Sequence, residues 1–258
     1  MSEEWVRGLA PWPKSDPARF GKVDRKPLSK MQRLVASFLA RNWVMIPHVT
    51  HHDEADVTVI EQRRSASNAA GGVRLTLVPL LVKALAAALR EFPHFNASLD
   101  ASGDLVLKSY VNIGVAVDTP GGLLVPVVRD CDTKSVSEIA TELTELSDKA
   151  RTKGLPMEQM SGGCMTLTSL GHIGGTGFTP IINAPEVAIL GVTRVRTTAV
   201  PDTDGRVVWR QMLPLSLSYD HRVINGADAA RFLRFVADRL NSEDLFRCRA
   251  GSADCSAH

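Results

Sequence analysis

The chain has 258 residues, of which 44% are hydrophobic and 22% are charged, and its formal net charge at pH 7 is +2. A chain of this length and composition buries a sizeable core and is ordinary for a globular protein. The small net charge argues against nucleic acid or an anionic membrane as a partner, and no apolar run reaches the ~18 residues expected of a membrane span.

The cysteines and the N-terminus indicate the compartment. Cys131, Cys164, Cys248 and Cys255 form no Cys-x-x-Cys pair and have no zinc-like spacing. The N-terminus lacks the basic and then apolar pattern of a secretory signal. We therefore expect reduced thiols in a cytoplasmic protein.

The chain divides into three segments. Residues 1–27 contain four prolines and few periodic apolar positions, which is typical of a linker or N-terminal arm. Residues 28–245 carry all the periodic patterns, and we expect them to form the folded domain. Residues 246–258 form a C-terminal tail of mostly small and polar residues.

Helix signals dominate the first third of the folded domain. Ser29 can cap a helix whose apolar residues share one face, and Pro47 ends helical structure at or before residue 46. A short extended piece, 48–52, separates it from a second helix, which Asp56 can cap and which ends at Gly71. The apolar residues that share one face of the first helix are Met31, Leu34, Val35, Phe38 and Leu39. A third helix over 76–92 is apolar nearly all round, so we expect it to be buried.

Strands follow, with helices between them. Ser135 and Glu138 form a capping box for a long helix that ends at Gly154, and residues 227–240 have the pattern of a final helix. The mixture lacks strict alternation of strand and helix, which favours an α/β layered domain with a mixed sheet. The strands that we expect are 104–109, 111–118, 123–129, 164–168, 187–192 and 212–219.

The segment 218–226, Ser-Tyr-Asp-His-Arg-Val-Ile-Asn-Gly, joins the last strand to the last helix. A histidine at such a junction is well placed to meet a substrate, and histidine is the side chain that titrates near neutral pH. His221 is therefore a candidate base. A structural role is the alternative, because a single histidine after a strand is more often structural than catalytic.

Four blocks carry a family resemblance. Residues 221–226 resemble the His-x-x-x-Asp-Gly motif of the dihydrolipoyl acyltransferases, the core subunits of 2-oxo acid dehydrogenase complexes; chloramphenicol acetyltransferases share this motif. Residues 42–50, 113–120 and 183–191 resemble the bacterial pyruvate dehydrogenase branch. The resemblance extends over about 12–240. It implies that residues 28–245 are an acyltransferase catalytic domain with a mixed-sheet, two-layer, chloramphenicol acetyltransferase-like fold.

The resemblance also implies the chemistry. The family's core transfers an acetyl group between dihydrolipoamide and coenzyme A in a pyruvate dehydrogenase-type complex. A thiol with a pKa near ~8.5 is mostly protonated at neutral pH, so a general base helps the sulfur to attack. By resemblance, His221 is that base.

Two site residues depart from the family pattern. Thr168 stands where the family has a serine. In the family, this serine belongs to the neighbouring subunit, and its hydroxyl group stabilises the oxyanion. Threonine keeps the hydroxyl group but adds a methyl group. The alternative is that Thr168 is only a β-branched strand residue. Asn225 stands where the family has an aspartate held by an arginine. Arg64 falls where that arginine lies, with the adjacent Arg63 as the alternative.

Other polar residues near the motif are weaker candidates. Asp220 precedes His221 directly, and neighbours on an extended chain point in opposite directions, so it is at most a supporting residue. His48, His51, His52, Asp53 and Glu54 form a cluster that could suggest a metal, but alternating faces separate His51 from His52, and the family that the chain resembles is metal-free. We expect no metal site.

The implied partners are those of the family. We expect a homotrimer with active sites at its subunit junctions, and either a lone trimer or a larger cage. Coenzyme A is a substrate whose contacts the sequence does not identify. The lipoyl group is expected on a domain absent from this chain. That lipoyl domain and the other subunits of the dehydrogenase complex are expected as binding partners.

Two alternative functions stay open at this point. The first is a chloramphenicol acetyltransferase-like enzyme that acylates a hydroxyl group. The second is a non-catalytic scaffold subunit of a 2-oxo acid dehydrogenase complex. The presence of His221 argues against a scaffold, whereas Thr168 and Asn225 keep that alternative open.

Overall fold

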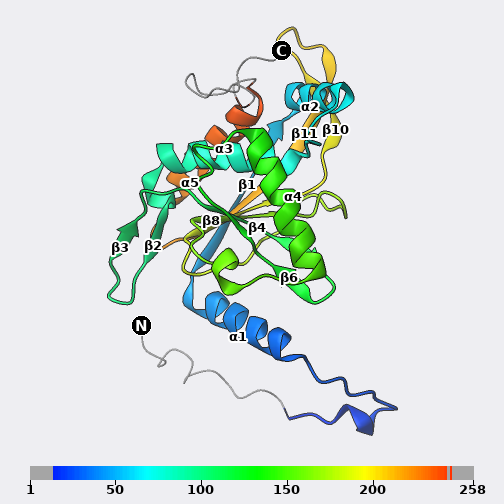
Figure 1. The fold of residues 1–258 in the computed structure, drawn as a ribbon, viewed down its shortest axis with the longest axis vertical. Helices are drawn as coiled ribbons and strands as arrows, with labels where there is room; N and C mark the ends of the chain where they lie inside the picture. The colour runs from blue at the N-terminus through cyan, green and yellow to red at the C-terminus, as the bar shows by residue number, and fades with distance from the viewer. Residues whose placement is uncertain (1–13, 243–244, 246–258) are drawn as a thin grey trace.

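A mixed seven-stranded β-sheet forms the centre of the protein (Figure 1). The computed structural model describes residues 14–242 and Leu245. The strand order is β1-β11-β9-β8-β4-β7, with β10 paired to β11; β8 runs parallel to β4 and β9, and the other pairs are antiparallel. The predicted mixed-sheet α/β class is confirmed.

The elements follow one another without strict alternation. The helices are α1 (Lys30–Met45), α2 (Thr58–Ala70), α3 (Leu77–Glu91), α4 (Val136–Thr152) and α5 (Gly226–Leu240). The strands of the large sheet are β1 (His48–Asp56), β4 (Ile113–Val115), β7 (Val127–Val128), β8 (Met165–Ser169), β9 (Ala188–Val192), β10 (Arg196–Pro201) and β11 (Val207–Asp220). Two hairpins pair β2 (Ala97–Leu99) with β3 (Leu105–Leu107), and β5 (Val117–Thr119) with β6 (Gly122–Leu124).

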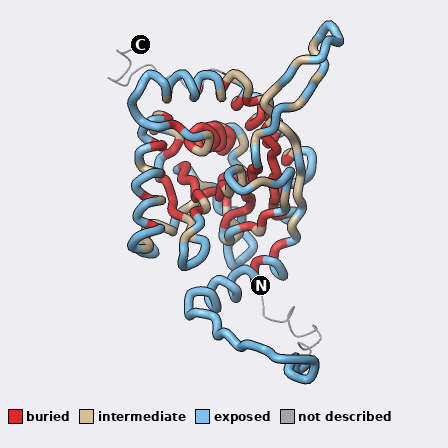
Figure 2. Tube along the Cα trace, turned by 90° about the vertical axis from the view of Figure 1, so that its right-hand side faces the viewer, coloured by how far each residue is buried: buried red, intermediate tan, exposed pale blue. Residues whose placement is uncertain are grey.

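One face of the sheet is apolar and packs under α3, α4 and α5. Leu167, Leu190 and Leu217 lie side by side on this face in neighbouring strands, and none has exposed surface. The same buried cluster contains the inward residues of the three helices. Figure 2 shows this buried centre in red, inside an exposed outer layer.

The local helix signals in the sequence are confirmed except at the start of α2, where the N-cap is Val57 rather than the predicted Asp56. Ser29 and Ser135 each form a complete capping box, at the start of α1 and α4. Helix α1 ends at Met45, before Pro47, and α3 is largely buried as predicted. None of the described helices is long and apolar enough to cross a membrane.

Several strand boundaries differ from the prediction, because pairing decides them. β1 continues to Asp56 because it pairs with β11 along its whole length. β11 begins at Val207 because its first half pairs with β10, a strand that we did not predict. The predicted strand 123–129 is interrupted at Pro126, which has no N–H for a ladder hydrogen bond.

Helix α1 stands apart from the body of the protein (Figures 1 and 2). Its apolar residues do share one side, but Leu34, Phe38 and Trp43 are exposed, and Asn42 is its one buried residue. Residues 14–28 are exposed and include one short 3-10 turn, Pro17–Arg19. The predictions for residues 1–13 and for the tail 246–258 lie outside the described residues.

Candidate active site

His221 lies on the turn between β11 and α5. Its backbone N–H donates to the carbonyl of Pro47 (3.1 Å), which fixes this point of the chain beside the start of β1. The residue is exposed, and its ring centre lies 5.9 Å from that of Tyr219. The backbone is therefore held while the imidazole stays accessible.

An ion pair between a buried carboxylate and an exposed arginine organises the same turn. Asp220 is only 2% exposed, and its carboxylate accepts hydrogen bonds from Arg222 Nε (2.9 Å) and Nη2 (2.6 Å). The backbone N–H of Arg222 also donates to it (3.0 Å). These contacts raise the pKa of the Arg222 guanidinium, and they engage Asp220 with Arg222. Asp220 thus supports the turn, as the sequence indicated.

Asn225 caps helix α5. Its Oδ1 accepts from the backbone N–H of Asp228 (2.9 Å), and its Nδ2 donates to the Asp228 carboxylate (2.7 Å). An asparagine is among the best residues for this position. Asn225 therefore fixes where α5 begins and, with it, the end of the turn that carries His221.

The expected contact between Arg64 and Asn225 is not formed within this chain. Arg64 instead donates to Glu61, one helical turn earlier (2.9 and 2.7 Å), and to the carbonyl of Leu75 (3.1 Å). The hydrogen bond to Glu61 raises the pKa of Arg64. The Glu61 carboxylate is on the same helix and carries a charge, so Arg64 pairs with it rather than with Asn225. A role for Arg64 at the site stays a prediction.

Thr168 lies on the wall of a cavity of about 740 Å³. Thr168 and Ser169 alternate across β8, and the Ser169 hydroxyl accepts a long hydrogen bond from the backbone N–H of Gly171 (3.4 Å). Opposite Thr168 on β9 is Gly191, where the ring of Phe178 leaves no room for a Cβ atom. Ser169 also lines this cavity, and other residues of the wall include Arg74, Asp118, Arg151 and His172.

His221 and Thr168 lie at opposite ends of the sheet. Thr168 pairs with Gly191 on β9, and Gly191 pairs with Ser216 on β11. Because β11 runs antiparallel to β8 and β9, the five residues from Ser216 to His221 lead toward the end of the sheet at which β8 begins. With ~3.3 Å per residue and ~4.8 Å per strand, the two Cα atoms are roughly 19 Å apart. Groups acting on one carbonyl must approach within hydrogen-bond distance, so the two residues of a single chain cannot share a substrate.

The other histidines of the sequence cluster form structural hydrogen bonds. His48 Nε2 accepts from the backbone N–H of Ile182 (3.0 Å), so Nδ1 carries the proton and donates to Ile46 O (2.8 Å). His52 bonds to Ser216 Oγ (3.0 Å). Within residues 14–242, no group of three or more His, Cys, Asp or Glu side chains is arranged to hold a metal ion.

Glu186 is a buried polar residue that we did not predict as part of the site. This residue is 5% exposed, and its Oε2 accepts a hydrogen bond from Thr166 Oγ1 (2.7 Å). Burial raises the pKa of its carboxyl group to about 7, although the hydrogen bond from Thr166 acts in the opposite direction. The available signal was a charged residue directly before a strand that is otherwise wholly apolar.

The fold is that of an acyltransferase class that includes chloramphenicol acetyltransferase. The structure superposes on a chloramphenicol acetyltransferase with a TM-score of 0.54 at 17% identity, which confirms the expected fold. The family model for the 2-oxoacid dehydrogenases acyltransferase (catalytic domain) matches residues 20–246. The chain belongs to this family.

Relatives with known names lie in the pyruvate dehydrogenase branch. The acetyltransferase component (dihydrolipoyllysine-residue) of the pyruvate dehydrogenase complex of Cupriavidus necator is 54% identical over 90% of this chain and 42% of the relative. The corresponding component of Pseudomonas aeruginosa is 52% identical, over 90% and 43%. The chain therefore spans less than half the length of these relatives.

Two solved structures match almost throughout. The dihydrolipoamide acetyltransferase of Azotobacter vinelandii has a TM-score of 0.89 at 49% identity, over 92% of this chain and 99% of that chain. That structure was determined to investigate the role of a serine, a histidine and an asparagine in catalysis. The second, described as the cubic core of a pyruvate dehydrogenase multienzyme complex, has a TM-score of 0.89 at 50% identity, with the same coverage.

Proposed function

We propose that this chain is the catalytic core that transfers an acetyl group between dihydrolipoamide and coenzyme A in a pyruvate dehydrogenase-type complex. The observation that carries the proposal is His221, accessible on a turn fixed by Pro47, Asp220 and Asn225, in a chain about half identical to named acetyltransferases. We take His221 and Asn225 as the counterparts of the histidine and asparagine that were investigated in the Azotobacter enzyme.

His221 acts as the general base. Its imidazole takes the proton of the coenzyme A thiol, and the sulfur attacks the carbonyl carbon of the acetyl-dihydrolipoamide thioester. The tetrahedral intermediate then collapses, the bond to the lipoyl sulfur breaks, and the imidazolium returns the proton to that sulfur. A base with this geometry typically contributes ~10²–10⁴-fold.

Thr168 of a neighbouring copy stabilises the oxyanion. The separation of roughly 19 Å within one chain, estimated from strand register, supports a site shared between copies. We assign the shared site to a homotrimer. A cubic assembly, the architecture described for one close structural relative, contains threefold axes, so a trimer is also a natural unit of a larger cage.

Helix α1 supports the same assembly. Met31, Leu34 and Phe38 are exposed, and residues three, four and seven apart share one face of a helix, so they form an apolar surface on a helix that stands away from its own body. Contiguous apolar surface of this kind marks a contact with another protein surface. We assign it to a contact with a second subunit.

The cavity that contains Thr168 suits one of the two thiol substrates. Arg74 and Arg151 on its wall are cations that suit the phosphate groups of coenzyme A. We assign the lipoyl group to a domain outside these 258 residues. The chain has one Asp-Lys-Ala tripeptide, the local sequence of lipoylated lysines, but it lies inside α4, where Lys149 Nζ donates to Gln159 (2.8 Å).

Steady-state kinetics of acyl transfer test this proposal directly. Acetyl-, succinyl- and branched acyl-coenzyme A would be compared as donors to dihydrolipoamide, with chloramphenicol as a competing acceptor and sedimentation of the same sample. We expect acetyl transfer to dihydrolipoamide by an oligomeric species. Transfer only to chloramphenicol, no transfer by a well-folded oligomer, or full activity in a monodisperse monomer would overturn it.

A further inference from the structure

Glu186 is a buried carboxyl group that the mechanism above does not use. Its Oε2 accepts from Thr166 Oγ1 (2.7 Å), and Asn183 Nδ2 lies 3.5 Å from both its Oε1 and Thr166 Oγ1. Asn183 and Glu186 belong to the loop before β9, and Thr166 belongs to β8. The cluster therefore fastens that loop to the strand that carries Thr168.

Two glycines make room for this cluster. A Cβ atom on Gly163 would lie 2.8 Å from Glu186 Oε1, and one on Gly114 would lie 3.1 Å from Thr166 Oγ1. Both distances are shorter than ordinary contacts. The carboxyl and the hydroxyl thus occupy fitted positions between neighbouring backbones.

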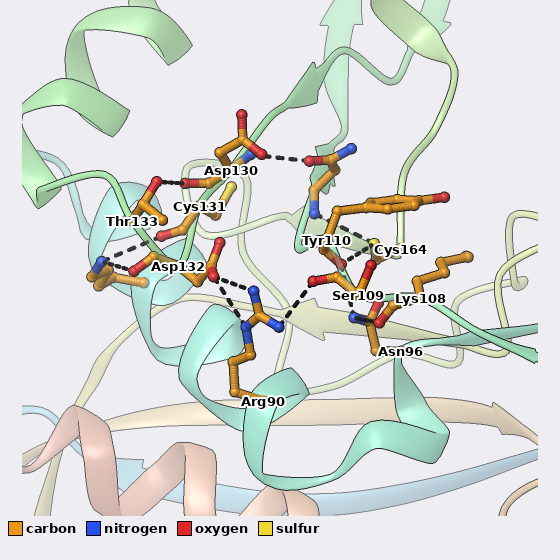
Figure 3. Close-up of polar contacts among 12 residues, drawn as sticks. Arg90, Asn96, Lys108, Ser109, Tyr110, Asp130, Cys131, Asp132, Thr133 and Cys164 are labelled. Atoms are coloured by element: carbon orange, nitrogen blue, oxygen red, sulfur yellow. Dashed lines mark hydrogen bonds and ion pairs between the residues drawn. The ribbon is translucent and has the colours of Figure 1, made fainter.

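One cation and one thiol face the carboxyl group. Lys108 Nζ donates to the carbonyls of Ala97 and Gly163 (3.3 Å each), and burial lowers its pKa. Figure 3 shows the segment that carries Lys108, held by Asn96, with the buried Cys164 beside it. Burial raises the pKa of the Cys164 thiol, so this thiol is uncharged at neutral pH. Lys108 is therefore the charged neighbour of Glu186.

The cluster lies on the same face of β8 as the proposed oxyanion donor. Side chains alternate along a strand, so Thr166 and Thr168 point to one side and Leu167 to the other. Thr166 is 1% exposed and bound to Glu186, whereas Thr168 reaches the cavity wall. A shift of Thr166 is transmitted to Thr168 through one intervening residue.

We propose that Glu186 is a positioning residue, which acts through Thr166 to set where Thr168 presents its hydroxyl group. The inference rests on the proposed acetyl transfer. A donor to an oxyanion acts only in the transition state, so its displacement lowers kcat and leaves KM almost unchanged. A displacement of ~1 Å at such a site lowers the rate by ~10²-fold.

Thr166→Val is the decisive variant, because it replaces the hydroxyl with a methyl group of similar size. We expect kcat to fall ~10–100-fold at constant KM and constant oligomeric state, and Thr166→Ser to restore most of it. Glu186→Gln keeps the acceptor for Thr166 and should retain activity within about threefold of wild type.

A double-mutant cycle separates positioning from general stability. If Thr166 acts through Thr168, then Thr166→Val lowers kcat by less than about threefold when Thr168 is already alanine. An equal loss in both backgrounds, or a wild-type kcat in Thr166→Val, overturns the inference. Should the wild type transfer no acetyl group, the proposed function fails instead; a crystal structure of Thr166→Val then decides, and an unmoved Thr168 side chain overturns the inference.

Discussion

Side chains on strand β8 alternate between two environments. Met165 and Leu167 lie in the apolar core under the helices, whereas Thr166 lies against Glu186 and Thr168 reaches a cavity. The same difference recurs on β1 and β11, whose second face has the hydroxyl and imidazole pairs Thr50–Ser218 (2.8 Å) and His52–Ser216 (3.0 Å). A period of two thus lets β1, β8 and β11 build the core with one residue and polar structure with the next.

The proposed base gives the largest expected effect. His221→Ala should lower kcat by ~10²–10⁴-fold without changing assembly, because the thiol then loses its proton acceptor. His51→Ala is the matched control. His51 is the β1 residue that pairs with Leu217 of β11, and its loss should leave activity within about twofold of wild type. Steady-state kinetics and sedimentation measure both; unchanged turnover in His221→Ala refutes the base assignment.

The alternation on β8 predicts which hydroxyl stabilises the oxyanion. Thr168→Ala should lower kcat by ~10²–10³-fold, the usual effect of losing one such donor. Ser169 lines the same cavity but lies on the other face of β8, and its hydroxyl accepts from Gly171, so Ser169→Ala should lower kcat by less than about threefold. A larger loss in Ser169→Ala than in Thr168→Ala would reassign the donor.

The apolar face should respond in stability rather than in chemistry. Leu167 has no exposed surface, so Leu167→Ala should lower the free energy of unfolding by about 2–5 kcal/mol. Urea denaturation measures this loss, and kcat per folded active site should stay near that of wild type. A kcat that falls with full retention of stability would contradict the division between the two faces.

Glu186 should make stability depend on pH. Its pKa of about 7 in the folded protein lies above the ordinary value of 4.5, so the folded state holds a proton that the unfolded state has released between these values. The free energy of unfolding therefore falls as pH rises from ~4.5 to ~7, by about 3 kcal/mol, and then levels off. Glu186→Gln should remove this decrease.

Urea denaturation of both proteins at pH 5 and pH 8 measures that difference. Lys108, the charged neighbour of Glu186, is present in both proteins, so the pH dependence that Lys108 itself contributes to stability is subtracted in the comparison. If wild type and Glu186→Gln lose the same stability between the two pH values, Glu186 does not titrate in this range.

Local signals predicted the elements that depend on a few neighbouring residues. The capping boxes at Ser29 and Ser135, the end of α1 before Pro47, and the turn that carries His221 all follow from such signals. β10 and the full length of β1 were not predictable, because each exists through pairing with the distant β11. The contact of Arg64 with Glu61 likewise depended on which carboxylate the fold brings nearest.

The amino-acid sequence by itself indicated the family through its resemblance to known motifs, and residue types at short spacing determined the α/β class and the histidine on the turn before the last helix. The tertiary structure alone decided that Glu186 is buried against Thr166, and that one chain keeps His221 and Thr168 at opposite ends of the sheet. Caps and turns need only local hydrogen bonds. Burial and separation depend on strand register, which residues far apart in the chain set together.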